Sequence, residues 1–377
     1  MKVALVCREF LSSKGGLEAY TAALSRELRR LGNEVHVFAN SWQTEEGLIF
    51  HRVPMIPVAS PAKNLSFAFL CAKSLARETF DVIQSMERIW FQDIYRASDG
   101  INPVQMQVRY RRRLLRFIKA AGPRRQALAF LERRIFMGSG CRIIMTNSEL
   151  IKRHIVAHYR VNPEKIRVIY NGVDRAKYHP GVKDQWRQSV REAWGIGEDQ
   201  NVLLFVGHDF KLKGLQLLLE AMASMKNENV RLLVVGSGDR RSYGRWTRKR
   251  GLEQHVLFLG STGEVEKLYA ASDLFVLPTL YDAFSNVCLE AMACGTPVIT
   301  SRNNGASELI RDGEEGYVLE RHEVGELVEK IRLSLSAEKR ATMGERAAIK
   351  ADGFTVQKHF AALLGLYQEI MNLKGRG

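Results

Sequence analysis

Long apolar runs are missing from this chain of 377 residues. No uninterrupted apolar segment reaches the roughly 20 residues that a membrane-spanning helix needs. The first residues, Lys2–Cys7, have the pattern of a short buried strand and are followed by Arg8 and Glu9, so we expect no secretion signal. These absences predict a globular protein of the cytoplasm.

Cysteine is scarce, and the number and spacing of these residues argue against a disulfide framework and against a cysteine-bound metal. The five residues are odd in number and do not have the spacing of metal-binding motifs. A reducing compartment fits them, and we expect each to be a small buried hydrophobic side chain. They are Cys7, Cys71, Cys141, Cys288 and Cys294.

Two catalytic signatures are also absent. The sequence contains no Asp-x-Asp pair, so the usual pair of carboxylates for a catalytic divalent metal is missing. No residue is an obvious nucleophile. We therefore expect no metal and no resident cofactor, and lysines, backbone N–H groups and helix ends must meet the charge of any reaction.

Positive charge, in contrast, is in excess. The formal net charge is +15, which implies an anionic partner. From Arg109 to Arg134, basic and apolar residues are interleaved at helical spacing and opposed only by Glu132. This segment can lie on an anionic membrane surface or hold a polyphosphorylated acceptor, and a solvated basic helix packed on its own domain is the alternative. No base-reading or stacking-aromatic motif accompanies the charge, so nucleic acid is not expected.

The length predicts two domains, and the two halves of the chain repeat one pattern. A strand at Val3–Val6, a turn ending Lys14-Gly15-Gly16 and a helix from Leu17 form the start of a nucleotide-binding βαβ unit. A strand at 201–207, a polar loop and a helix at 215–225 repeat it. The pattern predicts an α/β fold with two Rossmann-like parallel-sheet domains that face a cleft.

The domain boundary is expected near residue 170. The N-terminal domain then comprises residues 1–170, and the C-terminal domain residues 171–354. The polar stretch 175–200 is expected to be an irregular connection. The tail, residues 355–377, has the apolar pattern of an amphipathic helix that needs a surface to cover.

The stretch from Asp282 to Ile299 contains the strongest candidate site. Asp282 opens a polar loop directly after an apolar strand, where open α/β sheets bind ligands. Ser285 or Asn286 can cap the helix that follows, and its backbone N–H groups then suit a phosphate beside Asp282. Glu290, one turn further, can face the same crevice and accept hydrogen bonds from sugar hydroxyls. A solvated acid beside an ordinary capped helix is the alternative.

Two further charged residues also stand at the ends of strands. Lys213 lies in the loop between Gly207 and Gly214 and can neutralise a phosphate, for which it is a better candidate than Lys211. Asp99 follows the expected strand at 94–97, where its carboxylate can meet a ligand. A turn-forming Asp next to glycine explains Asp99 equally well.

Together these residues resemble glycosyltransferase family four, retaining enzymes of the GT-B fold, over nearly the whole chain. Within the family, the sequence is most similar to the lipopolysaccharide core glucosyltransferases that add the first glucose to inner-core heptose. The residues that carry the resemblance are Gly15-Gly16, Val168–Asp174, Gly207 with Lys213-Gly214, Asp282 with Glu290, and Glu290–Pro297.

The resemblance implies a role for each candidate residue. Lys213 pairs with the donor phosphates, Glu290 holds the ribose, Asp282 binds the donor sugar, and Asp99 lies near the reacting sugar or the acceptor. The implied catalytic residues are Asp99, Lys213 and Asp282. The implied donor-binding residues are Gly15, Gly16, Gly207, Lys213, Asp282, Phe284, Ser285, Asn286, Val287 and Glu290. The C-terminal helix crosses back to the first domain.

The implied reaction is metal-independent transfer of a hexose, with UDP-glucose as the expected donor, onto a lipid-linked core oligosaccharide. The enzyme is then peripheral on the inner face of the cytoplasmic membrane. Asp282 stands where the family often has Glu, and Leu212 where a second basic residue is common, so the donor sugar and the phosphate ligands stay open. A UDP-sugar epimerase on the same fold and a non-catalytic sugar-nucleotide or polyanion-binding protein are the alternative functions.

Overall fold

The computed structural model describes residues 1–11, 15–58, 60–110 and 112–375. Lys14, in the expected glycine turn, lies outside these ranges, and so does Arg111, which belongs to the basic segment from Arg109 to Arg134.

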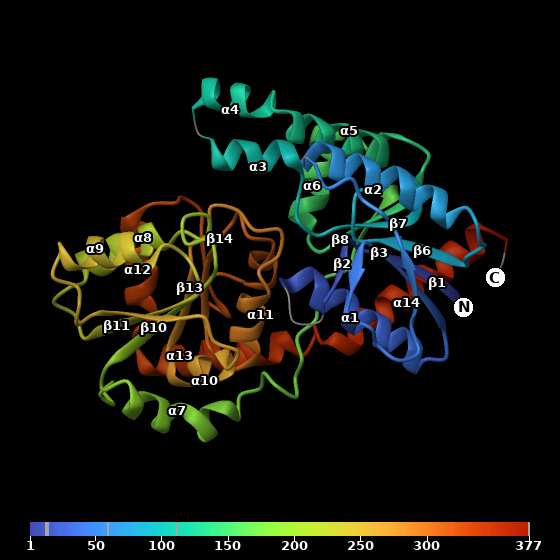
Figure 1. Cartoon of the computed structure of the whole chain (residues 1–377). Helices are drawn as coiled ribbons and strands as arrows, with labels where there is room; N and C mark the ends of the chain where they lie inside the picture. The colour runs from blue at the N-terminus through green and yellow to red at the C-terminus, as the bar shows by residue number, and fades with distance from the viewer. Residues whose placement is uncertain (12–14, 59, 111, 376–377) are drawn as a thin grey trace. The chain divides into compact units, whose positions relative to one another are not determined.

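The chain divides into two compact units (Figure 1). Unit 1 comprises Met1–Tyr170 and His359–Gly377, and unit 2 comprises Asn171–Lys358. Each unit contains its own parallel sheet with helices packed on it, which confirms the predicted α/β class.

The main sheet of unit 1 has seven strands in the order β5-β3-β1-β6-β7-β8-β9, all paired in parallel. The central strand β1 is fully buried from Val3 to Val6, as expected for a parallel sheet covered on both faces. The strands are β1 (Lys2–Val6), β3 (Glu34–Ala39), β5 (Ile49–Arg52), β6 (Val82–Ser85), β7 (Gln92–Ala97), β8 (Cys141–Thr146) and β9 (Ile166–Val168). A small second sheet pairs β2 (Glu9–Phe10) with β4 (Ser41–Trp42).

Helices lie on both faces of this main sheet. Figure 1 shows α2 and α5 on one side of it, and α1 and α14 on the other. The helices are α1 (Gly15–Arg30), α2 (Ser60–Leu75), α3 (Asn102–Arg109), α4 (Arg113–Ala120), α5 (Pro123–Met137), α6 (Glu149–Tyr159) and α14 (Val356–Leu373). The Ser148 hydroxyl caps α6 by accepting from the backbone N–H of Ile151 at 3.3 Å.

The C-terminal helix α14 completes the core of unit 1. It buries one apolar stripe, which includes Phe360, Leu363 and Ile370. Inside the unit, the Tyr367 hydroxyl donates a hydrogen bond to the side-chain carbonyl of Gln84, a residue with no solvent exposure. The surface that the amphipathic tail was expected to cover is therefore the core of unit 1.

The sheet of unit 2 has six parallel strands in the order β12-β11-β10-β13-β14-β15. They are β10 (Asn201–Val206), β11 (Val230–Val235), β12 (Val256–Gly260), β13 (Leu274–Leu277), β14 (Val298–Ser301) and β15 (Gly316–Leu319). The helices are α7 (Val182–Ala193), α8 (Leu215–Ser224), α9 (Arg240–Arg248), α10 (Val265–Ala271), α11 (Asn286–Ala293), α12 (Val324–Ser334) and α13 (Ala337–Ala351). Short 3₁₀ turns occupy Pro163–Lys165 in unit 1 and Gly305–Leu309 in unit 2.

The expectation that residues 175–200 form an irregular connection is wrong. This stretch contains the helix α7, which packs against α10 inside unit 2. The helix is polar because its contacts are ionic: Arg191 is buried and pairs with Asp273 at 3.4 Å. A polar composition therefore hid a helix that is anchored by a buried arginine.

The basic segment is three helices with different surroundings. Most of α5 packs on its own unit, and Glu132 on this helix is fully buried, paired with Arg88 at 3.0 Å and accepting a hydrogen bond from the Tyr159 hydroxyl at 2.6 Å. The helix α4 buries none of its residues. Figure 1 shows α3 and α4 extending beyond the sheet of unit 1. The packed-helix alternative therefore holds for α5, whereas α4 presents its side chains to solvent.

Among the described residues, no helix combines the length and the apolar character needed to span a bilayer.

Candidate active site

The loop between β10 and α8 in unit 2 is held in one shape by backbone contacts. The Lys213 N–H donates to the carbonyl of Asp209 at 2.8 Å, and the Leu280 N–H donates to the carbonyl of Leu212 at 2.8 Å. Gly214 has φ of +80°, and a Cβ there would lie 1.9 Å from the carbonyl oxygen of Pro278. Glycine is therefore required at this position, and the loop is fixed against the segment that leads to Asp282.

This loop brings Lys213 and Asp282 together. The Lys213 Nζ donates to Asp282 Oδ2, and both side chains are largely buried, with exposed fractions of 22% and 16%. The backbone of Asp282 is tied on both sides, since its N–H donates to the carbonyl of Asn303 and its carbonyl accepts from the N–H of Gly305, each at 3.0 Å. The two residues singled out from separate motifs therefore form one ion pair beyond the carboxyl ends of β10 and β13.

The helix α11 starts at Asn286, and its expected side-chain cap is wrong. Ser285 occupies the N-cap position, but its side chain makes no capping hydrogen bond. Instead, the Asn304 side-chain oxygen accepts from the backbone N–H groups of Ser285 and Ala306, each at 3.1 Å. The side chain of Asn286 accepts a hydrogen bond from the Asn171 amide at 2.8 Å.

Asn304 was missed in the sequence because it lies 19 residues beyond Ser285. It is fully buried, and its amide nitrogen also donates to the Thr300 hydroxyl at 2.9 Å. The turn-forming sequence Asn303-Asn304-Gly305 is the signal that could have indicated it. Asn304 thus holds the backbone just before α11 in place. The first N–H groups of α11, which have no acceptor within the helix, lie beside the loop that begins at Asp282.

Glu290, in the middle of α11, meets a partner that the sequence did not suggest. The hydroxyl of Tyr269, a fully buried residue of α10, donates to the Glu290 carboxylate and to the carbonyl of Val287, each at 3.1 Å. Burial raises the pKa of Glu290 to about 7. The carboxylate is therefore oriented by a buried hydroxyl and is protonated more readily than a solvated one.

Unit 1 contains the other candidates. Gly15 and Gly16 form the first turn of α1, and a Cβ at Gly16 would meet no atom within 4 Å. Packing therefore does not require glycine at residue 16. Asp99 follows β7 as an exposed residue beside Gly100, which has φ of +75°, and its backbone carbonyl accepts from the Gln105 amide at 2.7 Å. These contacts fit a turn and leave the carboxylate at the end of the strand.

The cysteines are buried free thiols, as expected. Burial raises the pKa of Cys288 and Cys294 to about 12, so these two residues, which lie on and just after α11, stay protonated at neutral pH. A protonated buried thiol is a poor nucleophile, so neither cysteine is expected to take part in the chemistry of the site.

The unit 2 site thus combines the ion pair of Lys213 and Asp282, the first N–H groups of α11 and the buried acid Glu290.

Comparison with known proteins identifies the class. Residues 14–177 match the family Glycosyltransferase Family 4, and residues 187–350 match the family Glycosyl transferases group 1. Each half of the chain thus carries a glycosyltransferase domain, and the protein belongs to the family-four glycosyltransferases with the GT-B fold.

Particular relatives extend over most of the chain. Lipopolysaccharide glucosyltransferase WaaG from Escherichia coli (strain K12) is 28% identical over 316 residues, covering 81% of this chain and 82% of that protein. The crystal structure of WaaG matches with a TM-score of 0.78 at 25% identity, covering 94% and 96% of the two chains. D-inositol 3-phosphate glycosyltransferase from Corynebacterium kroppenstedtii is 26% identical over 387 residues, covering 94% of this chain and 85% of that protein. The crystal structure of Anabaena HepE in complex with UDP-glucose shares the fold, with a TM-score of 0.74 at 19% identity. The match covers 100% of this chain and 99% of HepE.

Proposed function

We propose that this glycosyltransferase moves a hexose from a nucleotide sugar, UDP-glucose in the first instance, onto a lipid-linked core oligosaccharide such as lipopolysaccharide inner-core heptose. The likeness to WaaG over most of both chains supports the acceptor, and the HepE complex supports the donor. The ion pair between Lys213 and Asp282 is the observation that carries the proposal. It places a cation and a hydroxyl-binding acid side by side next to the N-terminus of α11.

In this proposal, the bound donor breaks the ion pair and contacts both of its members. The diphosphate takes the Lys213 ammonium and the first N–H groups of α11, and Asp282 then accepts hydrogen bonds from the sugar hydroxyls. Glu290, oriented by the Tyr269 hydroxyl, accepts from the ribose. No metal is needed, because fixed donors meet the charge that develops on the departing diphosphate. That phosphate also receives the acceptor proton, and the sugar is transferred with retention.

Replacing Lys213 tests this assignment. Lys213→Ala is expected to lower kcat by about 10²–10³, the typical effect of removing one preorganised donor from a developing anion. Lys211→Ala is the matched control, because Lys211 is an exposed residue of the same loop. Transfer of radiolabelled glucose from UDP-glucose to core oligosaccharide is the measurement. Equal turnover in the wild type and Lys213→Ala would contradict the assignment.

The donor is best identified by its effect on stability. A ligand that binds only the folded chain stabilises it by about 2.7 kcal/mol at 100 times its Kd. We expect UDP-glucose to raise the melting temperature more than UDP-galactose or UDP-N-acetylglucosamine does. Incubation with the donor alone then separates the alternatives, since an epimerase would convert it and a non-catalytic binder would leave it unchanged even when acceptor is added.

The membrane part of the proposal rests on α4. Its side chains Leu114 and Phe117 are 72% and 76% exposed, and Arg113, Arg116 and Lys119 are interleaved with them. Apolar residues that enter a headgroup layer together with basic residues that face anionic lipid are typical of a peripheral helix. Each basic residue near such a surface contributes about 1 kcal/mol. The proposed location is the inner face of the cytoplasmic membrane.

Vesicle sedimentation tests this role of α4. The chain is expected to bind vesicles that contain anionic phospholipid and not neutral ones. Phe117→Asp is expected to weaken that binding, whereas Phe91→Asp, which changes an exposed aromatic residue outside the segment, is expected to leave it unchanged. Equal binding of the wild type to both kinds of vesicle would contradict the proposal.

A further inference from the structure

Three possible metal ligands converge at one edge of the unit 1 sheet. His36 is a buried residue of β3, His51 lies on the edge strand β5, and Glu78 follows α2. A ring nitrogen from each histidine and a carboxylate oxygen of Glu78 lie within 4.8 Å of one another. None of the roles proposed above uses these residues.

The strand register produces this convergence. β3 and β5 pair in parallel with Phe38 opposite His51, so His36 and His51 lie diagonally across the two strands on one face. Both rings pack on aromatic neighbours: Phe38 stacks on His51 with centroids 4.3 Å apart, and Phe80 packs edge-on against His36 at 5.1 Å. The imidazoles are thus held close together by apolar contacts.

The hydrogen bonds assign the lone pairs. His36 Nε2 lies 2.7 Å from Glu34 Oε1, so in the neutral ring this nitrogen carries the hydrogen and donates it. The other nitrogen, Nδ1, then accepts a hydrogen bond from His51 Nε2 at 2.7 Å and lies 4.0 Å from Glu78 Oε2. A metal ion that bound both nitrogens would replace this shared hydrogen, which His51 can carry on its other ring nitrogen instead. A histidine whose second nitrogen donates to a carboxylate is the usual arrangement of a metal ligand, since that bond fixes the tautomer and the ring.

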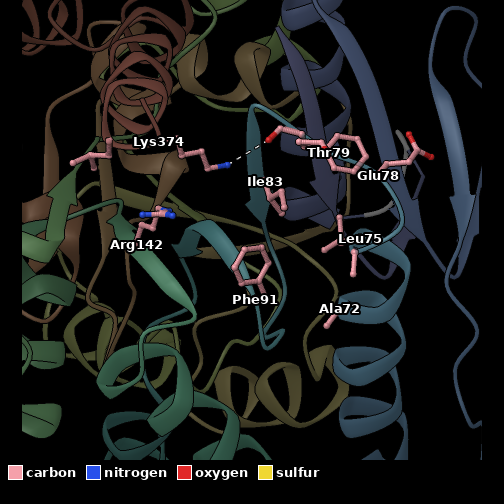
Figure 2. A pocket seen from close by; sticks show the side chains of 11 residues that line it. Ala72, Leu75, Glu78, Thr79, Ile83, Phe91, Arg142 and Lys374 are labelled. Atoms are coloured by element: carbon pink, nitrogen blue, oxygen red, sulfur yellow. Dashed lines mark hydrogen bonds between the residues drawn. The ribbon is translucent and has the colours of Figure 1, made fainter. Parts of the chain in front are cut away.

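The two carboxylates beside the histidines already bind a cationic side chain. Lys2 Nζ lies 2.9 Å from Glu78 Oε2 and 3.6 Å from Glu34 Oε1, so its ammonium would compete with a metal ion for these oxygens. Figure 2 shows Glu78 at the border of a cavity of about 740 Å³, with its carboxylate directed away from the basic residues Arg142 and Lys374. Its oxygen Oε2 lies 2.9 Å from Lys2 Nζ and 4.0 Å from His36 Nδ1.

We propose that His36, His51 and Glu78 bind a zinc ion, with Glu34 as the carboxylate that orients His36. Two histidines and one acid are a common zinc ligand set, with water in the fourth position. Tetrahedral zinc at about 2.0–2.1 Å from each nitrogen holds its ligands roughly 3.4 Å apart, so the two rings must separate by less than 1 Å. His51 is partly exposed on an edge strand, where such a shift is easily accommodated. The ion would join β3, β5 and the connection after α2.

Zinc titration of the metal-stripped full chain, in competition with a chromophoric chelator, tests the proposal. One equivalent is expected to bind. His51→Ala and Glu78→Gln are expected to abolish this binding, and Glu34→Gln is expected to weaken it by about 10- to 100-fold, as loss of an orienting partner does. Lys2→Met is expected to tighten it, because the competing ammonium is removed. Cobalt in place of zinc should give a visible absorption band that His51→Ala lacks.

His158→Ala, which changes an exposed histidine on α6, is the matched control and should bind zinc as the wild type does. Melting temperatures in chelator show whether each variant is folded, and zinc should raise the melting temperature of the wild type but not of His51→Ala. Wild-type affinity no greater than that of His51→Ala would overturn the proposal, and so would an equal loss in His158→Ala.

Discussion

At the residue scale, the unit 2 site is built from pairs that neutralise or orient one another. Lys213 and Asp282 satisfy each other's charge, so neither is left as an uncompensated ion in a largely buried position. Within the described part of the chain, no basic side chain forms a hydrogen bond with Glu290, whose carboxylate accepts one from the Tyr269 hydroxyl. Asp282 and Glu290, which are only eight residues apart, therefore have different environments: one carboxylate pairs with an ammonium, and the other accepts from a hydroxyl.

The raised pKa of Glu290 predicts a pH-dependent stability. Between its usual value of 4.5 and about 7, the folded chain keeps a proton that the unfolded chain has released. The free energy of unfolding therefore falls as pH rises through this window; the contribution is fully present below pH 4.5 and is lost above pH 7. A shift of this size corresponds to about 3 kcal/mol.

Glu290→Gln should remove this dependence, because the amide is neutral at every pH. We expect the variant to exceed the wild type in stability at pH 8 and to differ little from it at pH 4.5. Urea denaturation of both proteins at several pH values measures the effect. Parallel stability profiles for the two proteins would show that Glu290 does not titrate in this way.

At the element scale, α7 shows how a polar helix can be part of a core. Arg191 donates to the backbone carbonyls of Ala271, Gly197 and Gln200 as well as to Asp273. The same carboxylate oxygen of Asp273, Oδ2, also accepts from the N–H of Val202 at 2.8 Å, at the start of β10. One buried ion pair thus joins α7, the connection after it and the central sheet.

Arg191→Ala is expected to destabilise unit 2 by about 1–3 kcal/mol, because the buried carboxylate of Asp273 loses one of its arginine partners and keeps Arg187 at 2.7 Å. Gln185→Ala, at an exposed position of the same helix, should have little effect. Calorimetry can follow the transition of unit 2. If both variants melt with the wild type, the ion pair does not support the fold.

At the scale of the whole molecule, α14 returns the end of the chain to unit 1. The helix starts at Val356, and from His359 onward its residues belong to unit 1. Lys374, just after the helix, pairs with the fully buried Asp93 at 2.6 Å. The stability of unit 1 therefore depends on residues that lie beyond unit 2 in the sequence.

Tyr367→Phe tests this dependence, because it leaves the side-chain carbonyl of the buried Gln84 without the Tyr367 hydroxyl. The expected loss is about 1–3 kcal/mol, and it should affect the transition of unit 1 alone. Gln368→Ala, on the exposed side of α14, is the control. A lowered transition of unit 2 with unit 1 unchanged would contradict the assignment of α14.

Features that depend on neighbouring residues could be predicted from the sequence. Apolar runs such as Val3–Val6 predicted buried parallel strands, and the stripe of the tail predicted α14, because strand and helix periodicity are local. The resemblance to family-four glycosyltransferases followed from short motifs for the same reason. The edge strand β5 was missed, since its four residues, Ile49–Arg52, are neither continuously apolar nor strictly alternating.

Which distant residues meet could be seen only in the folded chain. Asn304 accepts from Ser285 across 19 residues, Tyr269 orients Glu290 across 21, and Lys213 reaches Asp282 across 69. The cluster of His36, His51 and Glu78 likewise depends on the pairing of β3 with β5. Such contacts depend on the order and register of strands in a sheet, which local composition does not encode. The motifs therefore indicated where the site lies, and the fold determined how its groups are paired.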